Sequence, residues 1–214
     1  MKKIVILGAN GQLGMELVHL LHSTSNTIIG LSSAQLDITN RRVVIEKINE
    51  IQPDVILDAA AYTKVDNAED TGKTQNWLVN ETGTQNVVDA ANAVDAVLVY
   101  VSTDYIFDGE STSEYLESSL PNPLNEYGKA KLSGERYVSE NSKRGYVVRT
   151  SWVYGEYGSN FYFTMLKLAK THSKLTVVDD QIGRPTWTMD LAKFIYFLIS
   201  NSVSFGTYNF CNSG

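Results

Sequence analysis

Short apolar runs alternate along this chain with segments in which apolar residues recur at helical spacing. The runs are rich in β-branched residues and are bounded by turn residues, so they predict strands over 3–7, 27–30, 54–58, 96–101, 146–149 and 175–178. Helical spacing predicts helices over 15–21, 40–51, 75–94, 126–141 and 188–200. Because the two kinds of segment alternate, the pattern predicts an α/β protein with a parallel sheet and helices on both faces.

Length, charge and cysteine content limit the number of domains, the partners and the cellular location that this fold can have. At 214 residues the chain is long enough for one large α/β domain and the start of a second lobe. The net charge of -6 argues against a nucleic-acid partner, which requires a basic surface. Cys211 is the only cysteine, and the apolar run after Met1 is too short for a signal peptide or a membrane span. These features predict a cytoplasmic protein with no membrane contact.

Three glycines follow the first predicted strand. Gly8 permits a tight turn, Gly11 lets a pyrophosphate approach the backbone, and Gly14 lets helix and strand pack closely. The helix that follows directs amide donors and its dipole at an anion. An ordinary strand–helix turn that happens to contain three glycines is the alternative. Since strand, glycines and helix come in the right order, we favour a nucleotide-binding turn.

A tyrosine and a lysine follow at the start of a later predicted helix. Tyr127 and Lys131 are four residues apart, which places them on one face of that helix. An ammonium near a phenol favours the phenolate, and we expect it to lower the pKa of Tyr127 toward neutrality, as a proton donor or acceptor requires. By itself the pair is better explained by a solvated helix face.

The order of these features resembles the extended short-chain dehydrogenase/reductase family. A nucleotide-binding turn is followed by a hydroxyl cluster after the fourth strand, a proline-containing loop and the Tyr–Lys pair. The stretches AAAYTKVD, STDYIFDG, RTSWVYG and DQIGRPT, which begin at positions 59, 102, 149 and 180, resemble in particular the family members that reduce dTDP-4-keto sugars. The resemblance covers the whole chain.

The resemblance implies a fold, a domain organisation and a reaction. The fold is a Rossmann-like doubly wound sheet, with an NAD(P)-binding domain over 1–150. Residues 151–214 form a mixed segment that contributes to the sheet and to a small, incomplete substrate lobe whose C-terminal part is missing. The implied reaction is the NAD(P)H-dependent reduction of dTDP-4-dehydro-L-rhamnose to dTDP-L-rhamnose. An epimerase or dehydratase of the same superfamily and a non-catalytic NADP-binding regulatory subunit are the alternatives.

The resemblance also implies residue roles. Tyr127 protonates the ketone oxygen, Lys131 holds the nicotinamide ribose and lowers the pKa of Tyr127, and Thr103 binds the same oxygen as an oxyanion-type donor. The implied cofactor contacts are Gly8, Gly11, Gln12, Leu13, Gly14, Asp37, Ile38, Ala61, Tyr62, Thr63, Tyr127 and Lys131. The implied substrate contacts are Thr103, Asp104 and Trp152. A place in the core for Trp152, and turn or helix caps for Asp104 and Asp37, are the structural alternatives.

The cofactor preference depends on the end of the second strand. Folds that prefer NAD usually carry an acidic residue there to bind the ribose 2′-hydroxyl. Residues 30–33 read GLSS, with neither an acid nor an arginine, which slightly favours NADPH over NADH. No metal-ligating side chains are predicted, while a Mg²⁺ requirement and a homodimer stay open.

Overall fold

A computed structural model describes residues 1–201 and 203–213. Its elements in chain order are β1 (Lys3–Leu7), α1 (Gln12–His22), β2 (Thr27–Leu31), α2 (Arg41–Ile51), β3 (Val55–Asp58), α3 (Val65–Ala68), α4 (Lys73–Trp77), the π-helical η1 (Leu78–Gly83), α5 (Thr84–Ala93), β4 (Val97–Thr103), the 3₁₀ turn η2 (Asp104–Ile106), α6 (Glu126–Asn141), β5 (Gly145–Thr150), β6 (Val153–Tyr154), α7 (Phe161–Ala169), β7 (Thr186–Trp187), α8 (Thr188–Ser200) and β8 (Gly206–Asn209).

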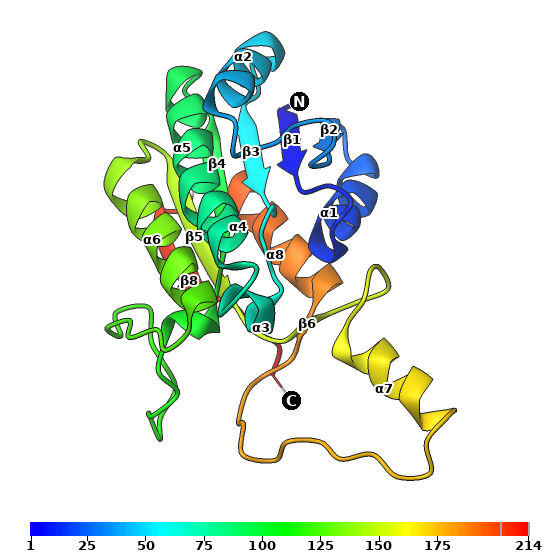
Figure 1. Ribbon diagram of the computed structural model, residues 1–214. Coiled ribbons are helices and arrows are strands. Elements are labelled where there is room, and N and C mark those ends of the chain that lie inside the picture. The colour runs from blue at the N-terminus through cyan, green and yellow to red at the C-terminus, as the bar shows by residue number, and fades with distance from the viewer. Residues whose placement is uncertain (202, 214) are drawn as a thin grey trace.

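Within the described residues, six strands form one sheet in the order β2-β1-β3-β4-β5-β8, and every neighbouring pair is parallel. The first five predicted strands are confirmed. Strand β8 was not predicted, because its sequence GTYN has no apolar run and its residues are only half-buried. The fold class is therefore the predicted doubly wound parallel sheet (Figure 1).

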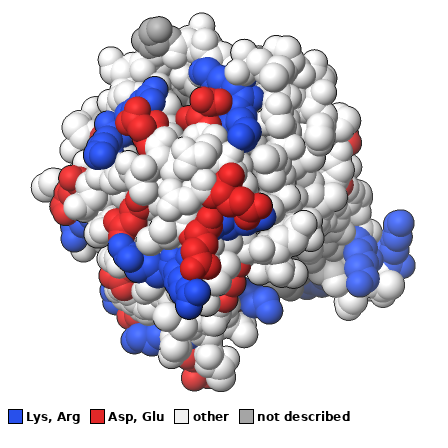
Figure 2. Space-filling model, turned by 90° about the horizontal axis from the view of Figure 1, so that it is seen from above, with Lys and Arg blue, Asp and Glu red and all other residues white. Residues whose placement is uncertain are grey.

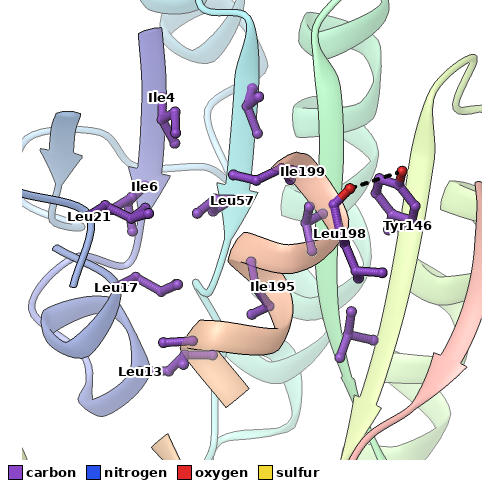
Figure 3. Packing of buried hydrophobic residues seen from close by; sticks show 14 of the residues in the cluster. Ile4, Ile6, Leu13, Leu17, Leu21, Leu57, Tyr146, Ile195, Leu198 and Ile199 are labelled. Atoms are coloured by element: carbon purple, nitrogen blue, oxygen red, sulfur yellow. Dashed lines mark hydrogen bonds between the residues drawn. The ribbon is translucent and has the colours of Figure 1, made fainter. Parts of the chain in front are cut away.

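Two apolar layers hold the helices on the sheet. Alternate strand residues such as Ile6 and Leu57 pack against α1 and α8 on one face. Their neighbours, such as Val5 and Ile56, pack against α2, α5 and α6 on the other. Figure 3 shows the first layer, in which Leu17 and Ile195 approach each other between the two helices. Because both faces are covered, the strands are continuous apolar runs, as parallel sheets require.

The predicted helix over 75–94 exists in a modified form. It runs from α4 through η1 into α5, so the chain stays helical from Lys73 to Ala93 and passes through a π-helical stretch in the middle. A π-helical stretch inserts an extra residue in the helix and is frequent at functional sites. The α1 helix begins at Gln12, three residues before the predicted start, so its N-terminus lies directly after Gly11.

The predicted strand over 175–178 is wrong. The chain between α7 and β7 has no regular structure there, and Val177 and Val178 are 49% and 69% exposed. A β-branched run becomes a strand only when a neighbouring strand can bond to it. In Figure 1, α7 and the chain that follows it extend away from the sheet, so this run meets no sheet edge.

Charged side chains of both signs are interspersed on the face shown in Figure 2. Several are paired, including Arg42 with Glu46 and Arg144 with Asp95. Among the residues that the structure describes, every helix is too short or too polar to cross a bilayer.

Candidate active site

The glycine turn takes the geometry that its sequence predicts. Gly8 has a φ of 72°, and a side chain there would lie within 2.8 Å of the backbone of residues 59 and 60. A Cβ at Gly14 would overlap the carbonyl oxygen of Gly8, so this glycine lets α1 begin directly against the turn. Gly11 is the N-cap of α1 and has no side chain to occupy the amides at the start of the helix. Leu13 lies on the buried side of the helix.

The second segment predicted to contact the cofactor lies beside this turn, after β3. Ala61 and Thr63 are exposed, and Tyr62 is half-buried. The backbone of Tyr62 is held by one side chain, because Asn80 Oδ1 accepts from its amide at 3.0 Å and Asn80 Nδ2 donates to its carbonyl at 2.9 Å. Asn80 lies in η1 and also donates to Asn76 at 2.7 Å, and Asn76 donates to the carbonyl of Glu126 at 2.8 Å. Side-chain amides thus join the cofactor segment to the first residue of α6.

Neither asparagine stands out in the sequence by itself. Asn76 and Asn80 lie at helical spacing with the buried Thr84 and Val87, so both occupy the apolar side of the predicted helix. A buried amide costs free energy unless it is fully hydrogen-bonded. An asparagine pair on the buried side of a helix is therefore the signal that could have identified this connection.

The predicted adenine contacts lie after β2, at the far side of the turn. Ile38 is buried, and the absence of a side chain at Gly83 makes room for its terminal atoms. Asp37 is exposed and accepts from the amide and hydroxyl of Thr39. Asn40, and not Asp37, caps α2, because its side chain accepts from the amide of Val43.

Tyr127 lies in the first turn of α6, and two local features place it. Asn125 caps the helix by accepting from the amide of Gly128 at 2.7 Å. A Cβ at Gly128 would overlap the carbonyl oxygen of Tyr105, so only glycine lets α6 lie this close to η2. The rings of Tyr105 and Tyr127 then meet edge to face, with centroids 5.6 Å apart. Tyr127 is buried, so the alternative of a solvated helix face is wrong.

The predicted substrate-binding hydroxyl lies at the end of β4, beside Tyr127. Thr103 is buried and caps η2, because its Oγ1 accepts from the amide of Tyr105 at 3.2 Å and donates to Asp104 at 3.1 Å. Burial raises the pKa of the Asp104 carboxyl above its ordinary value, against the hydrogen bond from Thr103. Asp104 does not cap a helix by its own side chain, and the cap is Thr103.

Lys131 is buried one turn after Tyr127. Its Nζ donates to the carbonyl of Val101 at 2.7 Å and lies 4.0 Å from the centroid of the Tyr100 ring. Burial lowers the pKa of this ammonium to about 8, while the charges of Asp58 and Glu135 oppose the shift. The helix therefore brings the Tyr–Lys pair to the end of β4, as its spacing predicts.

The expected lowering of the Tyr127 pKa is wrong. Burial raises the pKa of the phenol well above its ordinary value, and the charges of Asp104 and Tyr105 add to this. A hydrogen bond with Thr103 acts in the opposite direction. The physical reason is that the phenol is desolvated while the ammonium of Lys131 is directed at Val101 and Tyr100.

The segment after β5 contacts the glycine turn through Gln12. Gln12 Nε2 donates to the carbonyl of Val153 at 3.0 Å, and its Oε1 accepts from Asn160, the N-cap of α7, at 2.8 Å. Trp152 precedes this contact with a φ of 46°, which is strained for a tryptophan. Trp152 is 44% exposed and its ring lies against Gly183, so Trp152 is not a core residue.

The residues present fit a dinucleotide. Gly8 lets the turn pack against the backbone of residues 59 and 60, and Gly14 lets α1 begin against the turn. The N-terminus of α1 has Gly11 as its N-cap and no side-chain cap, so its amides and dipole suit a phosphate. The described residues hold no group of three or more His, Cys, Asp or Glu side chains suited to a metal, so the structure does not support a Mg²⁺ site.

The fold and the site together define a class. A parallel sheet in this order, a three-glycine turn after β1, and Thr103, Tyr127 and Lys131 at the end of β4 are the features of an extended short-chain dehydrogenase/reductase.

Comparison with known proteins identifies the family. The family model described as RmlD substrate binding domain matches residues 1–214. The chain is 41% identical to the dTDP-4-dehydrorhamnose reductase of Aggregatibacter actinomycetemcomitans, over 98% of this chain and 73% of that protein. It is 40% identical to the spore coat polysaccharide biosynthesis protein SpsK of Bacillus subtilis, over 100% of this chain and 75% of that protein.

A solved structure agrees with the family that the sequence comparison gives. The crystal structure of dTDP-4-dehydrorhamnose reductase from Bacillus anthracis in complex with NADP superposes with a TM-score of 0.96 at 43% identity, and the match covers 100% of this chain and 75% of that one. The chain therefore belongs to the dTDP-4-dehydrorhamnose reductase family. It spans about three quarters of the length of these relatives.

Proposed function

We propose that this chain reduces the C4 ketone of dTDP-4-dehydro-L-rhamnose to the alcohol of dTDP-L-rhamnose, with NADPH or NADH as the reductant. The observation that carries the proposal is the group of Thr103, Tyr127 and Lys131 at the end of β4, in a chain that is 41% identical to a reductase of this name. When bound, the nicotinamide supplies a hydride to the ketone carbon.

Tyr127 donates the proton that the ketone oxygen needs. Burial keeps its phenol protonated at neutral pH, which is the form that a reduction requires. When substrate is bound, the hydroxyl of Thr103 turns its one proton from Asp104 to the same oxygen and stabilises the negative charge that develops there. The product is an alcohol whose new C–H and O–H bonds take up one hydride and one proton.

Lys131 acts through its positive charge. Its ammonium is held beside the end of β4 by the carbonyl of Val101, where it binds the nicotinamide ribose. The same charge stabilises the phenolate that Tyr127 leaves behind after proton transfer. The phenol is therefore protonated before the reaction and is made a better acid only while the proton leaves.

The cofactor is held by the glycine turn and the two flanking segments. The backbone of Gly11, Gln12 and Leu13 lines the pyrophosphate, and Gly8 and Gly14 shape the turn that holds it. Asp37 and Ile38 lie at the adenine, and Ala61, Tyr62 and Thr63 contact the middle of the cofactor. We propose that NADPH is preferred because the end of β2 carries no acid.

The substrate lies between the end of β4 and the segment after β5. Asp104 and Trp152 contact the sugar nucleotide, and we assign residues 151–187 to the substrate side of the molecule. The strained backbone of Trp152 supports this assignment, because strain of this kind persists mainly at functional positions. A cytoplasmic location and a homodimer remain predictions.

The test follows loss of the reduced nicotinamide absorbance with dTDP-4-dehydro-L-rhamnose as substrate, for NADPH and NADH separately. We expect oxidation that depends on the sugar nucleotide, with the lower KM for NADPH. A chain that binds NADPH and leaves it unoxidised would contradict the reductase and favour an epimerase or a regulatory subunit.

A further inference from the structure

One buried carboxylate has no part in the proposed reaction. Asp58 is the last residue of β3 and is 1% exposed. Its Oδ1 accepts from the amide of Ala60 at 3.2 Å. Its Oδ2 is buried and has no hydrogen-bond partner among the residues that the structure describes. A buried charged oxygen in this situation is costly, so it calls for an explanation.

The sheet register places Asp58 on the face of the sheet that the ammonium of Lys131 covers. Asp58 pairs with Tyr100 of β4, and paired residues on neighbouring strands have their side chains on the same face of the sheet. On that face the ammonium of Lys131 lies over the Tyr100 ring. Strand β3, strand β4 and helix α6 thus contribute a carboxylate, an aromatic ring and an ammonium to one buried cluster.

Two other titratable groups of α6 belong to the same surroundings, and neither replaces Asp58. Glu135 follows Lys131 by one turn, but it already accepts from the Arg149 guanidinium at 2.6 Å and from Ser102 at 2.6 Å. Tyr127 is kept neutral by burial, as is Tyr100, because burial raises the pKa of each phenol.

The charges of Asp58 and Lys131 each favour the ionised form of the other. Burial raises the pKa of Asp58 to about 6, and the charge of Lys131 opposes this shift. Burial lowers the pKa of Lys131 to about 8, and the charge of Asp58 is the largest effect that opposes it. Between these values both groups are ionised, and each reduces the cost of burying the other.

We propose that Asp58 is a positioning residue of this site, whose buried carboxylate is the counter-charge that keeps Lys131 in its ammonium form beside the end of β4. The carboxylate acts on the reaction through Lys131 and not through contact with substrate. Only the kinetic consequence of this proposal rests on the proposed function, since the charge coupling exists whatever the chain reduces.

The direct test is an NMR titration of the Lys131 side chain, with ¹³C-labelled lysine and with the signal assigned by Lys131→Met. Asp58→Asn keeps the shape of the side chain and removes its charge. We expect it to lower the titration midpoint of Lys131 by about one pH unit or more, as the loss of a nearby opposite charge does. An unchanged midpoint would overturn the proposal.

Two further variants make the titration specific. Asp54→Asn is the matched control, because Asp54 precedes the same strand and accepts from the amide of Lys3 at its opposite end. We expect no shift of the Lys131 midpoint in this variant. Asp58→Ser removes the charge with a smaller side chain, so it repeats the test should Asp58→Asn fold poorly. A shift as large in Asp54→Asn would contradict a specific role of Asp58.

The pH profile of kcat/KM gives the kinetic consequence. Reduction requires the ammonium of Lys131, so the rate falls as pH rises through the pKa of that group. We expect Asp58→Asn to move this alkaline limb to lower pH by the shift that NMR measures, while the rates below pH about 6 stay equal because Lys131 is charged in both proteins.

The two measurements separate the two proposals. A shifted Lys131 midpoint in a chain that oxidises no NADPH supports the role of Asp58 and contradicts the reductase. An active reductase whose Lys131 midpoint does not move contradicts the role of Asp58 alone.

Discussion

Helices α6 and α7 are built in different ways. Helix α6, which carries Tyr127 and Lys131, has eight buried residues and packs against β4, β5 and η1. Helix α7, which we propose to lie on the substrate side, has no buried residue, and Phe161 and Tyr162 are 65% and 55% exposed. Proton transfer needs fixed geometry and a dry environment, so the reacting groups are placed where the sheet and its helices are most tightly packed.

The buried charges sharpen this contrast. Arg149 and Glu135 form an ion pair at 2.6 Å that also includes Ser102 and the carbonyl of Glu117. This pair joins α6 to β4, β5 and the loop before α6. On the substrate side, the pair of Arg184 with Glu114 is exposed at both ends and is solvated. An arginine–carboxylate pair therefore affects the free energy of unfolding strongly where it is buried and little where it is exposed.

The largest expected effect concerns the proton donor. Tyr127→Phe removes the phenolic hydroxyl and keeps the ring packed against Tyr105, so turnover should fall about 10²- to 10⁴-fold with little change in NADPH affinity. Steady-state kinetics and a cofactor binding titration measure the two quantities. Tyr137→Phe, which removes another hydroxyl from α6 far along the same helix, is the control and should keep full turnover. Comparable turnover in both variants would remove Tyr127 from the reaction.

The next effect concerns the buried ion pair. Arg149→Met leaves the Glu135 carboxylate buried without its partner and should lower the free energy of unfolding by about 3–5 kcal/mol. Arg144→Met at the start of the same strand breaks an exposed pair with Asp95 and should cost about 0–1 kcal/mol. Urea denaturation measures both values. Equal losses would show that burial does not distinguish the two pairs.

The smallest effect is expected in α7. Leu166→Ala alters a side chain that is 45% exposed and should change the free energy of unfolding by about 0.5 kcal/mol or less. Leu198→Ala in α8 removes a side chain that is 1% exposed and should cost about 2–5 kcal/mol. Thermal or urea unfolding of the two variants tests the comparison. A large loss in Leu166→Ala would mean that α7 is packed against other parts of the protein.

Much of the site follows from local sequence, but not its electrostatics. The glycine turn is predictable because Gly14 packs on the backbone of Gly8, a few residues away, and because Gly8 takes a positive φ that favours glycine whatever surrounds it. The position of Tyr127 and Lys131 on one helix face is predictable for the same reason. The direction of the Tyr127 pKa was not, because it depends on burial by η2 and β4, which come from distant positions in the chain.

The strand predictions show the same limit. Runs such as 3–7 and 96–101 become strands because each finds a parallel partner in the sheet. Residues 175–178 have similar side chains but lie in the chain after α7, which extends away from the sheet (Figure 1). Among the described residues, no strand pairs with them there. The weakly apolar GTYN of β8 becomes a strand because β5 offers it an open edge.

The sequence by itself determined the first five strands of the sheet, the glycine turn after β1 and the spacing of Tyr127 and Lys131. These depend on backbone sterics and on the periodicity of apolar residues, which act over a few residues. Only the tertiary structure decided that Asp58 and Lys131 are buried on the same face of the sheet, on either side of Tyr100 in the chain of contacts from β3 to α6. Desolvation and charge coupling depend on what surrounds a group in space, and that is set when β3, β4 and α6 pack together.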